Sequence, residues 1–241
     1  MVIEKFQFPS RGFHIVARKV GEADYFLGKL KEVHGYYNEF SYILSAFASA
    51  ARSITFALQA VMTRYPGFDS WYVSHQEKLK ANGLAKYFVN LRNYTQKVGE
   101  TPISHTGTIR DGKINHVSYF LDIDDLKGAP SGEVTKLAEE YFVEVLKVVE
   151  KCYRDFWVYA DPRAIFTEEG LALLGWVIED IEEAVGLPRG YTDIPYHGED
   201  KSFQRLRLLA REFQGDEMME EYFVKYGLQS TANKALQRTS R

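Results

Sequence analysis

Two consecutive stretches between residues 23 and 65 carry apolar residues at helical spacing, and this feature constrains the fold of the chain most. In the first stretch the apolar positions recur at steps of three and four, so they form one stripe on a helix: Phe26, Leu30, Val33 and Tyr37. The second stretch runs from about Glu39 to Val61, and Pro66-Gly67 ends it. Each stripe must be buried against another element. The pattern therefore predicts two long antiparallel helices on which a helical bundle is built.

The second of these helices is rich in alanine and serine between Ser45 and Ala51. Small side chains allow a neighbouring helix to approach closely, so we expect a tight helix–helix contact on this face. The stretch Tyr42 to Met62 is interrupted by serine, threonine, arginine and glutamine, which makes it too polar to cross a bilayer. Residues 1–18 contain no apolar run long enough for a signal peptide. These features predict a cytoplasmic protein that does not associate with a membrane.

One segment carries a β signal. Ser104 to Arg110 and Lys113 to Leu121 flank Asp111-Gly112, a pair that readily adopts the positive φ angles of a two-residue hairpin turn. A β-hairpin is therefore predicted at about residues 104–121. Further helical patterns follow it, at about residues 133–160, 167–186, 202–213 and 216–226. The predicted fold class is mainly α: a helical bundle with a small β-hairpin insertion.

The predicted organisation has three parts. The first comprises residues 1–22. Apolar residues alternate there at Phe13, Ile15 and Ala17, which favours an N-terminal arm that is extended or paired as a short edge strand. Residues 23–229 form the helical bundle domain, which includes the hairpin. Residues 230–241 are polar and aperiodic, so we expect a loosely ordered tail.

The charge of the chain limits the ways in which it can bind nucleic acid. The chain has 30 Lys and Arg residues and 33 Asp and Glu residues, which gives a formal net charge of −3. Proteins that attract nucleic acid through their global field are usually basic. Only a local basic patch is therefore expected here.

The sequence lacks the common motifs for metal, phosphate and nucleophile chemistry. It contains no GxxxxGK[ST] loop, no GxGxxG after a strand, no HExxH, no CxxC and no GxSxG. Its one cysteine, Cys152, excludes an intrachain disulfide and a thiolate zinc cluster. Cys152 falls on an apolar helix face, where we expect a buried thiol. No cofactor and no metal site are predicted.

Two clusters nevertheless contain metal-ligating residue types. His105 and His116 face each other across the predicted hairpin, where two histidines can ligate a metal, but an exposed cross-strand polar pair is the commoner arrangement. An acidic run lies on the polar face of the helix predicted at residues 167–186. We expect this run to be a solvated surface rather than a metal site: Glu179, Asp180, Glu182 and Glu183.

The cluster Leu91-Arg92-Asn93-Tyr94 is the candidate binding site. It lies near the end of a predicted helix, where the charge of Arg92 is favourable to the helix dipole and its planar fork can bind phosphate or carboxylate. The alternative is a structural role, in which Arg92 and Asn93 tie the helix end to its neighbour. The chemistry of these residues leaves both interpretations open.

Three segments together share the pattern of a known superfamily: Asn38 to Gln59, then Phe68-x-x-Trp71-Tyr72, then Lys86-Tyr87-Phe88-x-x-Leu91-Arg92-Asn93-Tyr94. They resemble the HEPN superfamily (higher eukaryote and prokaryote nucleotide-binding), helical-bundle proteins of which many are ribonucleases or toxins. The resemblance covers about residues 23–98. It implies RNA or a nucleotide as a partner, and a homodimer whose protomers share a cleft. In that family an arginine and a polar residue precede a histidine, and Arg92 and Asn93 match this pair. Lys97 stands where the histidine is expected.

The missing histidine leaves three functional hypotheses and no assigned catalytic residue. Metal-independent RNA cleavage needs a group that accepts and donates protons near neutral pH. In the first hypothesis, the protein contacts the phosphate of RNA or of a nucleotide through Arg92, Asn93 and Lys97, without full catalytic machinery. In the second, it is a ribonuclease toxin that uses His105 or Lys97 as a non-standard base. In the third, it is a non-enzymatic helical module that binds a protein or a small ligand.

Aromatic residues are abundant, with 16 Phe, 16 Tyr and 3 Trp. Such rings bury large areas in a core or across an association surface. The small-residue face at residues 45–51 can be covered by a second copy or within one chain. Together these features favour a homodimer.

The end of the chain carries a second resemblance. The segment from Ala232 to Thr239 (ANKALQRT) resembles translated read-through of an integron recombination site, as found at the ends of gene-cassette proteins. This resemblance implies a bacterial accessory protein in a mobile-gene context. The alternative is a coincidental short polar helix.

Overall fold

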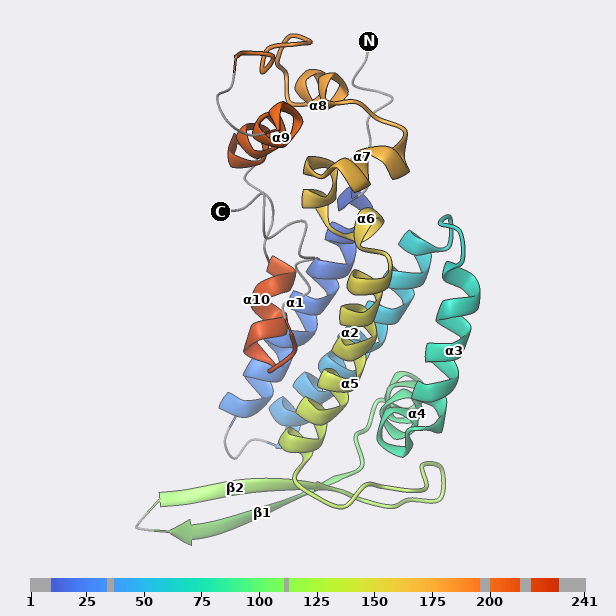
Figure 1. Cartoon of the computed structure of the whole chain (residues 1–241). Coiled ribbons are helices and arrows are strands. Elements are labelled where there is room, and N and C mark those ends of the chain that lie inside the picture. The colour runs from blue at the N-terminus through green and yellow to red at the C-terminus, as the bar shows by residue number, and fades with distance from the viewer. Residues whose placement is uncertain (1–9, 34–36, 111–112, 196–199, 213–217, 230–241) are drawn as a thin grey trace. The chain divides into compact units, whose positions relative to one another are not determined.

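A computed structural model of the chain describes residues 10–33, 37–110, 113–195, 200–212 and 218–229 (Figure 1). Ten α-helices and one two-stranded antiparallel sheet occur within these residues. This architecture confirms the predicted fold class, a mainly α protein with a small β-hairpin. Packing divides the chain into two compact units, the bundle unit (Ile15–Val149) and the terminal unit (Met1–His14 with Glu150–Arg241).

Five helices and the hairpin contribute to the bundle unit: α1 (Ser10–Glu32), α2 (Tyr37–Met62), α3 (Phe68–Ala81), α4 (Gly83–Val98), β1 (Ile103–Arg110), β2 (Lys113–Phe120) and α5 (Val134–Asp155). The ends of α4 follow directly from its sequence. Asn82 begins the helix, because its side chain accepts a hydrogen bond from the Ala85 N–H at 3.0 Å. Gly99 ends it with a φ of 78°, a left-handed conformation that glycine adopts without strain.

The core of the bundle unit contains stacked and edge-on rings from α2, α4 and α5. Phe47 of α2 lies edge-on to Phe88 of α4, with ring centroids 6.1 Å apart. Phe88 in turn stacks on Tyr141 of α5 at 4.6 Å. All three rings are buried, and each such pair contributes about 0.5–1.5 kcal/mol beyond its buried area. These contacts fix the ring of Tyr141 and therefore the position of its hydroxyl.

The small-residue face of α2 forms the close helix contact that its sequence predicts. Ala48, Ala50 and Ala51 are buried. Ser45 of this face donates a hydrogen bond to the Thr95 hydroxyl of α4 at 3.3 Å. A helix of the same chain therefore covers part of the face.

Among the described helices, α2 alone is long and apolar enough to cross a membrane by length and composition. In its most apolar window, 44% of the residues are buried inside the protein. Its central place in the bundle core accounts for this apolar character.

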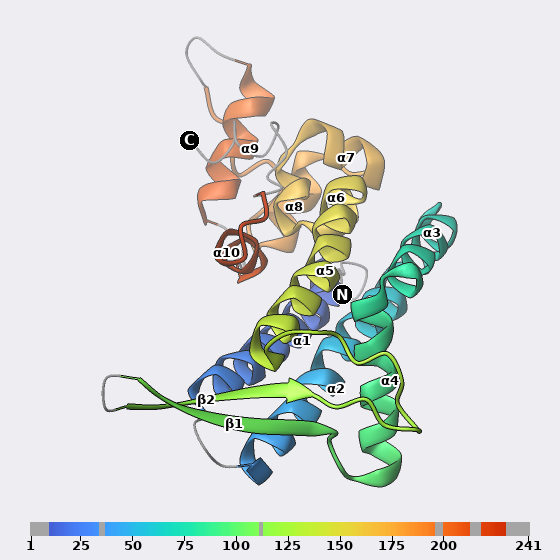
Figure 2. The ribbon, with the colours of Figure 1, turned by 90° about the horizontal axis from the view of Figure 1, so that it is seen from below.

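The hairpin pairs β1 with β2 in the predicted antiparallel arrangement, with His105 opposite Ser118 and Gly107 opposite His116. His105 and His116 are thus diagonal neighbours on one face of the hairpin. The turn residues Asp111 and Gly112 lie outside the described residues. Figures 1 and 2 show the hairpin crossing the end of the bundle where α2 begins. The ring of His105 contacts Phe40 there, with centroids 5.1 Å apart.

The predicted N-terminal arm at residues 1–22 is wrong from Ser10 onward, because α1 begins there. Alternation of Phe13, Ile15 and Ala17 favoured an extended segment, yet Ile15 is 51% exposed. The buried positions instead recur at steps of three and four, which is helical spacing: Phe13, Val16, Val20, Ala23, Leu27 and Leu30. Residues 1–9 and the predicted tail at 230–241 lie outside the described residues.

The described elements of the terminal unit, beyond the ends of α1 and α5, are short: α6 (Trp157–Ala160), the 3₁₀ helix η2 (Pro162–Phe166), α7 (Glu168–Leu174), α8 (Ile178–Ala184), α9 (Lys201–Glu212) and α10 (Met218–Lys225). A single helix was expected at residues 167–186, but Gly175 interrupts it with a φ of 68°. The unit has its own core, which includes Phe166, Ile181 and Leu209. Cys152 is fully buried, as predicted, and burial raises the pKa of its thiol.

The prediction that the acidic run of α8 is a solvated surface is wrong at Glu182, whereas the other three carboxylates of the run are partly exposed. Glu182 is 0% exposed and accepts hydrogen bonds from the Thr192 N–H at 2.8 Å and from Arg205 Nη2 at 3.0 Å. Arg205 also pairs with Glu179, and Arg189 pairs with both Asp180 and Glu183. Two arginines that follow α8 in sequence therefore pair with the four carboxylates of the run.

Candidate functional site

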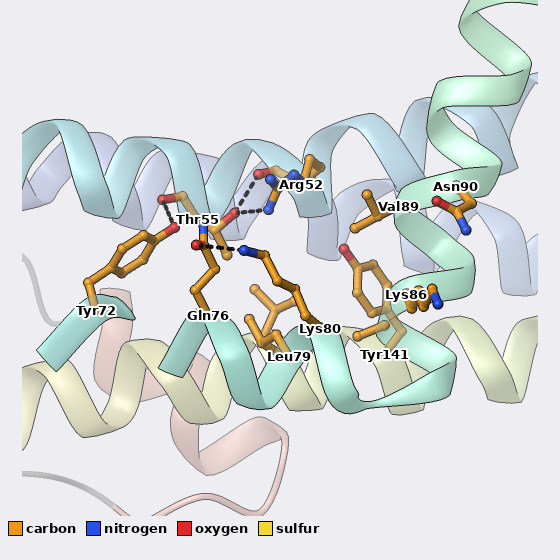
Figure 3. Close-up of a pocket in the computed structure, with 12 residues that line it drawn as sticks. Arg52, Thr55, Tyr72, Gln76, Leu79, Lys80, Lys86, Val89, Asn90 and Tyr141 are labelled. Carbon is orange, nitrogen blue, oxygen red and sulfur yellow. Dashed lines mark hydrogen bonds between the residues drawn. The ribbon is translucent and has the colours of Figure 1, made fainter. Parts of the chain in front are cut away.

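A cavity of about 240 Å³ lies between helices α2, α3, α4 and α5 of the bundle unit (Figure 3). Each of the four helices contributes lining side chains: Arg52 and Thr55 from α2, Tyr72, Gln76, Leu79 and Lys80 from α3, Ala85, Lys86, Val89 and Asn90 from α4, and Tyr141 and Val145 from α5. We call this space the bundle cavity.

The bundle cavity is positively charged. Arg52, Lys80 and Lys86 line it, and its lining includes neither a carboxylate nor a histidine. Within the described part of the chain, none of these three cations takes part in an ion pair. A concave site lined by one sign of charge concentrates its field and attracts ions of the opposite sign. The cavity is therefore suited to an anion.

Arg52 is held in place without a counter-charge. Its Nη1 donates to the Thr55 hydroxyl at 2.9 Å, and that hydroxyl donates to the Arg52 carbonyl at 3.0 Å. The guanidinium also lies over the ring of Phe56, 4.3 Å from its centroid. Arginine carries five N–H donors, so several remain for a ligand. The side chain is thus preorganised and only partly satisfied.

Two buried tyrosines place hydroxyl groups at the cavity wall. The Tyr72 hydroxyl donates to the Thr55 carbonyl at 3.2 Å, whereas the Tyr141 hydroxyl has no hydrogen-bond partner among the described residues. Burial raises the pKa of Tyr141 to about 12, against the opposing effect of the Arg52 charge. Burial raises the pKa of Tyr72 as well. Both groups are therefore protonated donors at neutral pH, and the Tyr141 donor is unused.

The predicted site residues all lie on α4, the helix that gives Lys86 and Asn90 to the cavity. Steps of four, three and four residues separate Lys86, Asn90, Asn93 and Lys97, so these side chains share one face of the helix. All four are exposed. Asn93 and Lys97 therefore continue a polar face that begins at the cavity.

Arg92 is turned away from this face and is half-buried. Its Nη1 donates to the Asn93 side-chain oxygen at 3.2 Å, and its Nε is buried without a hydrogen-bond partner. Within the described residues it makes no ion pair. Because α4 continues to Val98, Arg92 does not lie at the helix end where the sequence analysis placed it. Arg92 and Asn93 do form a pair, but they do not cap the helix.

His105, the alternative base of the ribonuclease hypothesis, lies in a different place. It lines a second cavity of about 300 Å³ together with His116, and neither Arg92 nor Lys97 lines that space. Its Nδ1 shares a hydrogen bond of 2.7 Å with the Ser118 hydroxyl. Burial, together with the neighbouring His116, lowers the pKa of His105. Within the described residues, no group of three or more histidine, cysteine or carboxylate side chains is placed to hold a metal ion.

Sequence reasoning missed the residues that give the bundle cavity its positive charge and its unused hydroxyl group. In the sequence, Arg52 is the arginine that interrupts the apolar stretch Tyr42 to Met62, and Tyr141 is one residue of the helical pattern at about residues 133–160. A cation within an otherwise buried helix is a usable signal, because burial of an unpaired charge is costly unless a partner or a ligand compensates it. Lys80 and Lys86 carry no such signal, since exposed lysines are common.

A family model described as bacteriophage lambda protein ea47 matches residues 14–127. The chain is similar to this phage family over just under half of its length. The matched segment extends from α1 to the residues after the hairpin, and it contains Arg52, Lys80 and Lys86. No curated protein and no solved structure matches the chain.

Proposed function

We propose that the bundle unit is a non-catalytic binding module for the phosphate group of a nucleotide or of RNA. One observation carries the proposal: the bundle cavity has three cations in its lining and no carboxylate to neutralise them. Phosphate is the common biological anion for which arginine forks and lysine ammonium groups are suited. The resemblance to the HEPN superfamily supports the same class of ligand.

The predicted residues of α4 extend this site. Asn93 and Lys97 offer further polar contacts along the helix face that leads away from the cavity, and Arg92 supports Asn93 through their hydrogen bond. In this proposal the phosphate lies at the cavity, and the remainder of the ligand lies over the exposed face of α4.

We also propose a cytoplasmic location, which the sequence analysis predicts. A non-catalytic role agrees with the placement of the possible bases. No hydrogen bond joins Arg92 to a histidine in the part of the chain that the structure describes. The ribonuclease alternative would need such a neighbour to exchange protons with the 2′-hydroxyl. Binding without cleavage is therefore our proposal for the bundle unit.

The proposal is tested by titration calorimetry of the purified full chain with inorganic phosphate and with adenosine 5′-monophosphate. We expect saturable binding that weakens about twofold to fivefold in Lys80→Gln, as expected for loss of one exposed charge contact. Lys78→Gln is the matched control, because Lys78 lies on the same helix, is also exposed and does not line the cavity. Absence of binding to both probes, or equal weakening in the two variants, would overturn the proposal.

A homodimer remains part of the proposal. The small-residue face of α2 is partly covered by α4, so the remaining support comes from exposed rings on α1 and α2: Tyr25, Tyr42 and Phe56. Light scattering at micromolar concentration should give twice the chain mass, and Tyr42→Ser should shift it toward the monomer. A monomeric wild type contradicts the expectation.

A further inference from the structure

The Tyr141 hydroxyl is a buried donor that the fold does not use. Its residue is 3% exposed, and its ring is fixed by the stack on Phe88. Tyr141 lines the bundle cavity, so its unused hydroxyl is available to a ligand there. In the view of Figure 3 the hydroxyl points from the ring toward α2, the helix that carries Arg52. The positive charge of Arg52 acts on this hydroxyl.

The charge of the cavity matches a particular kind of phosphate. A phosphate monoester carries about −1.5 to −2 charges at pH 7, whereas each phosphodiester within a nucleic-acid strand carries one. Three cations with no acidic group in the lining are better balanced by a monoester. The inferred ligand group is thus the more highly charged of the two.

The size of the cavity leads to the same choice. At about 240 Å³ it falls just below the range of roughly 300–1,000 Å³ that is usual for small-molecule sites. A terminal phosphate enters such a space with a single covalent connection leading out. An internal phosphodiester needs room for two connections. A small cavity lined by four helices therefore favours the end of a molecule.

We propose that the bundle cavity selects a terminal phosphomonoester and that the Tyr141 hydroxyl, together with Arg52, donates hydrogen bonds to its oxygens. Lys80 and Lys86 contribute their charges from the exposed rim. This inference rests on the proposed function and narrows it from phosphate in general to one chemical form. The group that determines specificity is then the Tyr141 hydroxyl, although the local sequence pattern predicts only a buried core residue at this position.

The test compares two tyrosine-to-phenylalanine variants of the full chain. Tyr141→Phe removes the hydroxyl and keeps the ring contacts. Tyr87→Phe is the matched control, because the Tyr87 hydroxyl is also buried without a hydrogen-bond partner but does not line the cavity. Both variants should unfold close to the wild-type temperature, since neither hydroxyl makes a hydrogen bond within the described residues. Only Tyr141→Phe should bind adenosine 5′-monophosphate about tenfold to hundredfold more weakly. Equal affinity in the two variants would overturn the role of Tyr141.

Three further probes distinguish the ligand form and its source. A short RNA with a 5′-phosphate should bind better than the same RNA with a 5′-hydroxyl, and adenosine should not bind. If adenosine 5′-monophosphate binds as tightly as the phosphorylated RNA, a free nucleotide is sufficient to supply the phosphomonoester that the cavity binds. If both RNAs bind equally and Tyr141→Phe changes neither, the monoester inference fails while the proposed phosphate binding stands. If no phosphate-containing probe binds the wild type, the proposed function itself fails.

Discussion

The two units of this protein place an arginine in opposite electrostatic surroundings: Arg205 of the terminal unit is buried, whereas Arg52 of the bundle unit is only partly buried and lines a cavity. In the terminal unit, Arg205 pairs with Glu182 and Glu179 at 3.0 and 2.6 Å, and its Nε donates to the Thr192 hydroxyl. In the bundle unit, Arg52 has a threonine and an aromatic ring as neighbours and no ion-pair partner within the described residues. Breaking a buried ion pair leaves the remaining charge uncompensated, whereas a partly exposed, unpaired cation at a cavity can be compensated by a bound anion. The arrangement of Arg205 indicates a structural role, and that of Arg52 indicates a role in binding a ligand.

The largest effect should come from breaking the paired arrangement. Arg205→Met leaves Glu182 buried without its counter-charge, so we expect the free energy of unfolding to fall by about 3–5 kcal/mol. Urea denaturation of the full chain measures this change. Binding of adenosine 5′-monophosphate at a temperature where the variant is folded should stay unchanged. A loss below about 1 kcal/mol would mean that the pair is not structural.

Lowering the pH should weaken the Glu182–Arg205 ion pair in the unmutated protein. Burial acts to raise the pKa of Glu182, but the hydrogen bonds from Thr192, Arg205 and Gly190 outweigh it and lower that pKa to about 2. Because the pKa in the folded protein lies below its ordinary value, the contribution of Glu182 is present above about pH 4.3 and is lost as the pH falls toward 2. The free energy of unfolding, measured between pH 6 and pH 2, should decrease over this window. Glu182→Gln should show a smaller decrease, and an identical pH profile would contradict the assignment.

Substitution of the unpaired Arg52, the counterpart of Arg205→Met, should change the affinity for a ligand more than it changes the free energy of unfolding. Arg52→Met removes the guanidinium from the bundle cavity, so affinity for adenosine 5′-monophosphate should fall about tenfold or more. The free energy of unfolding should change by less than about 1 kcal/mol, because the lost contacts are a single hydrogen bond and a ring contact. Calorimetric titration and urea denaturation of the same preparation separate the two effects. The comparison fails if Arg52→Met destabilises as strongly as Arg205→Met.

The smallest effect on ligand affinity is expected for Lys97, at the end of the polar α4 face that lies farthest from the cavity along the helix. Lys97→Gln should change the affinity for adenosine 5′-monophosphate less than twofold, because Lys97 does not line the cavity. It should weaken binding of a 5′-phosphorylated RNA more clearly and reduce the slope of log K against log salt by up to about 0.7. Titrations at several salt concentrations provide this measurement. A change of the same size for both ligands would place Lys97 at the phosphate itself.

The fold was largely accessible from sequence because its signals are local. The hairpin is specified by Asp111-Gly112 between alternating strands, and α2 by its long apolar stripe. The error at the N-terminus arose because Phe13, Ile15 and Ala17 alternate over a span too short to distinguish a period of two from 3.6. Only the wider set of buried positions, from Phe13 to Leu30, reveals the helix.

The site was accessible only in part, because cavities are made by residues far apart in the chain. Sequence reasoning pointed to α4, the helix that contributes Lys86 and Asn90 to the cavity, while the binding roles of Asn93 and Lys97 stay predictions. It could not place Tyr141 beside Arg52, since 89 positions separate them and either residue alone has an ordinary structural explanation. The prediction for the acidic run of α8 was wrong at Glu182 for the same reason, because its partner Arg205 lies 23 positions away in the sequence.

The single buried thiol of Cys152 makes this chain a convenient starting point for site-specific labelling. Labelling reagents for thiols are electrophiles that the thiolate attacks, and the raised pKa and full burial keep Cys152 in the protonated, unreactive form. A cysteine introduced at Lys78, which is exposed and does not line the cavity, would therefore carry a fluorophore almost exclusively, without prior removal of the native residue. Such a dye, attached on α3 two residues before Lys80, would report occupancy of the cavity without replacing a residue of the proposed site.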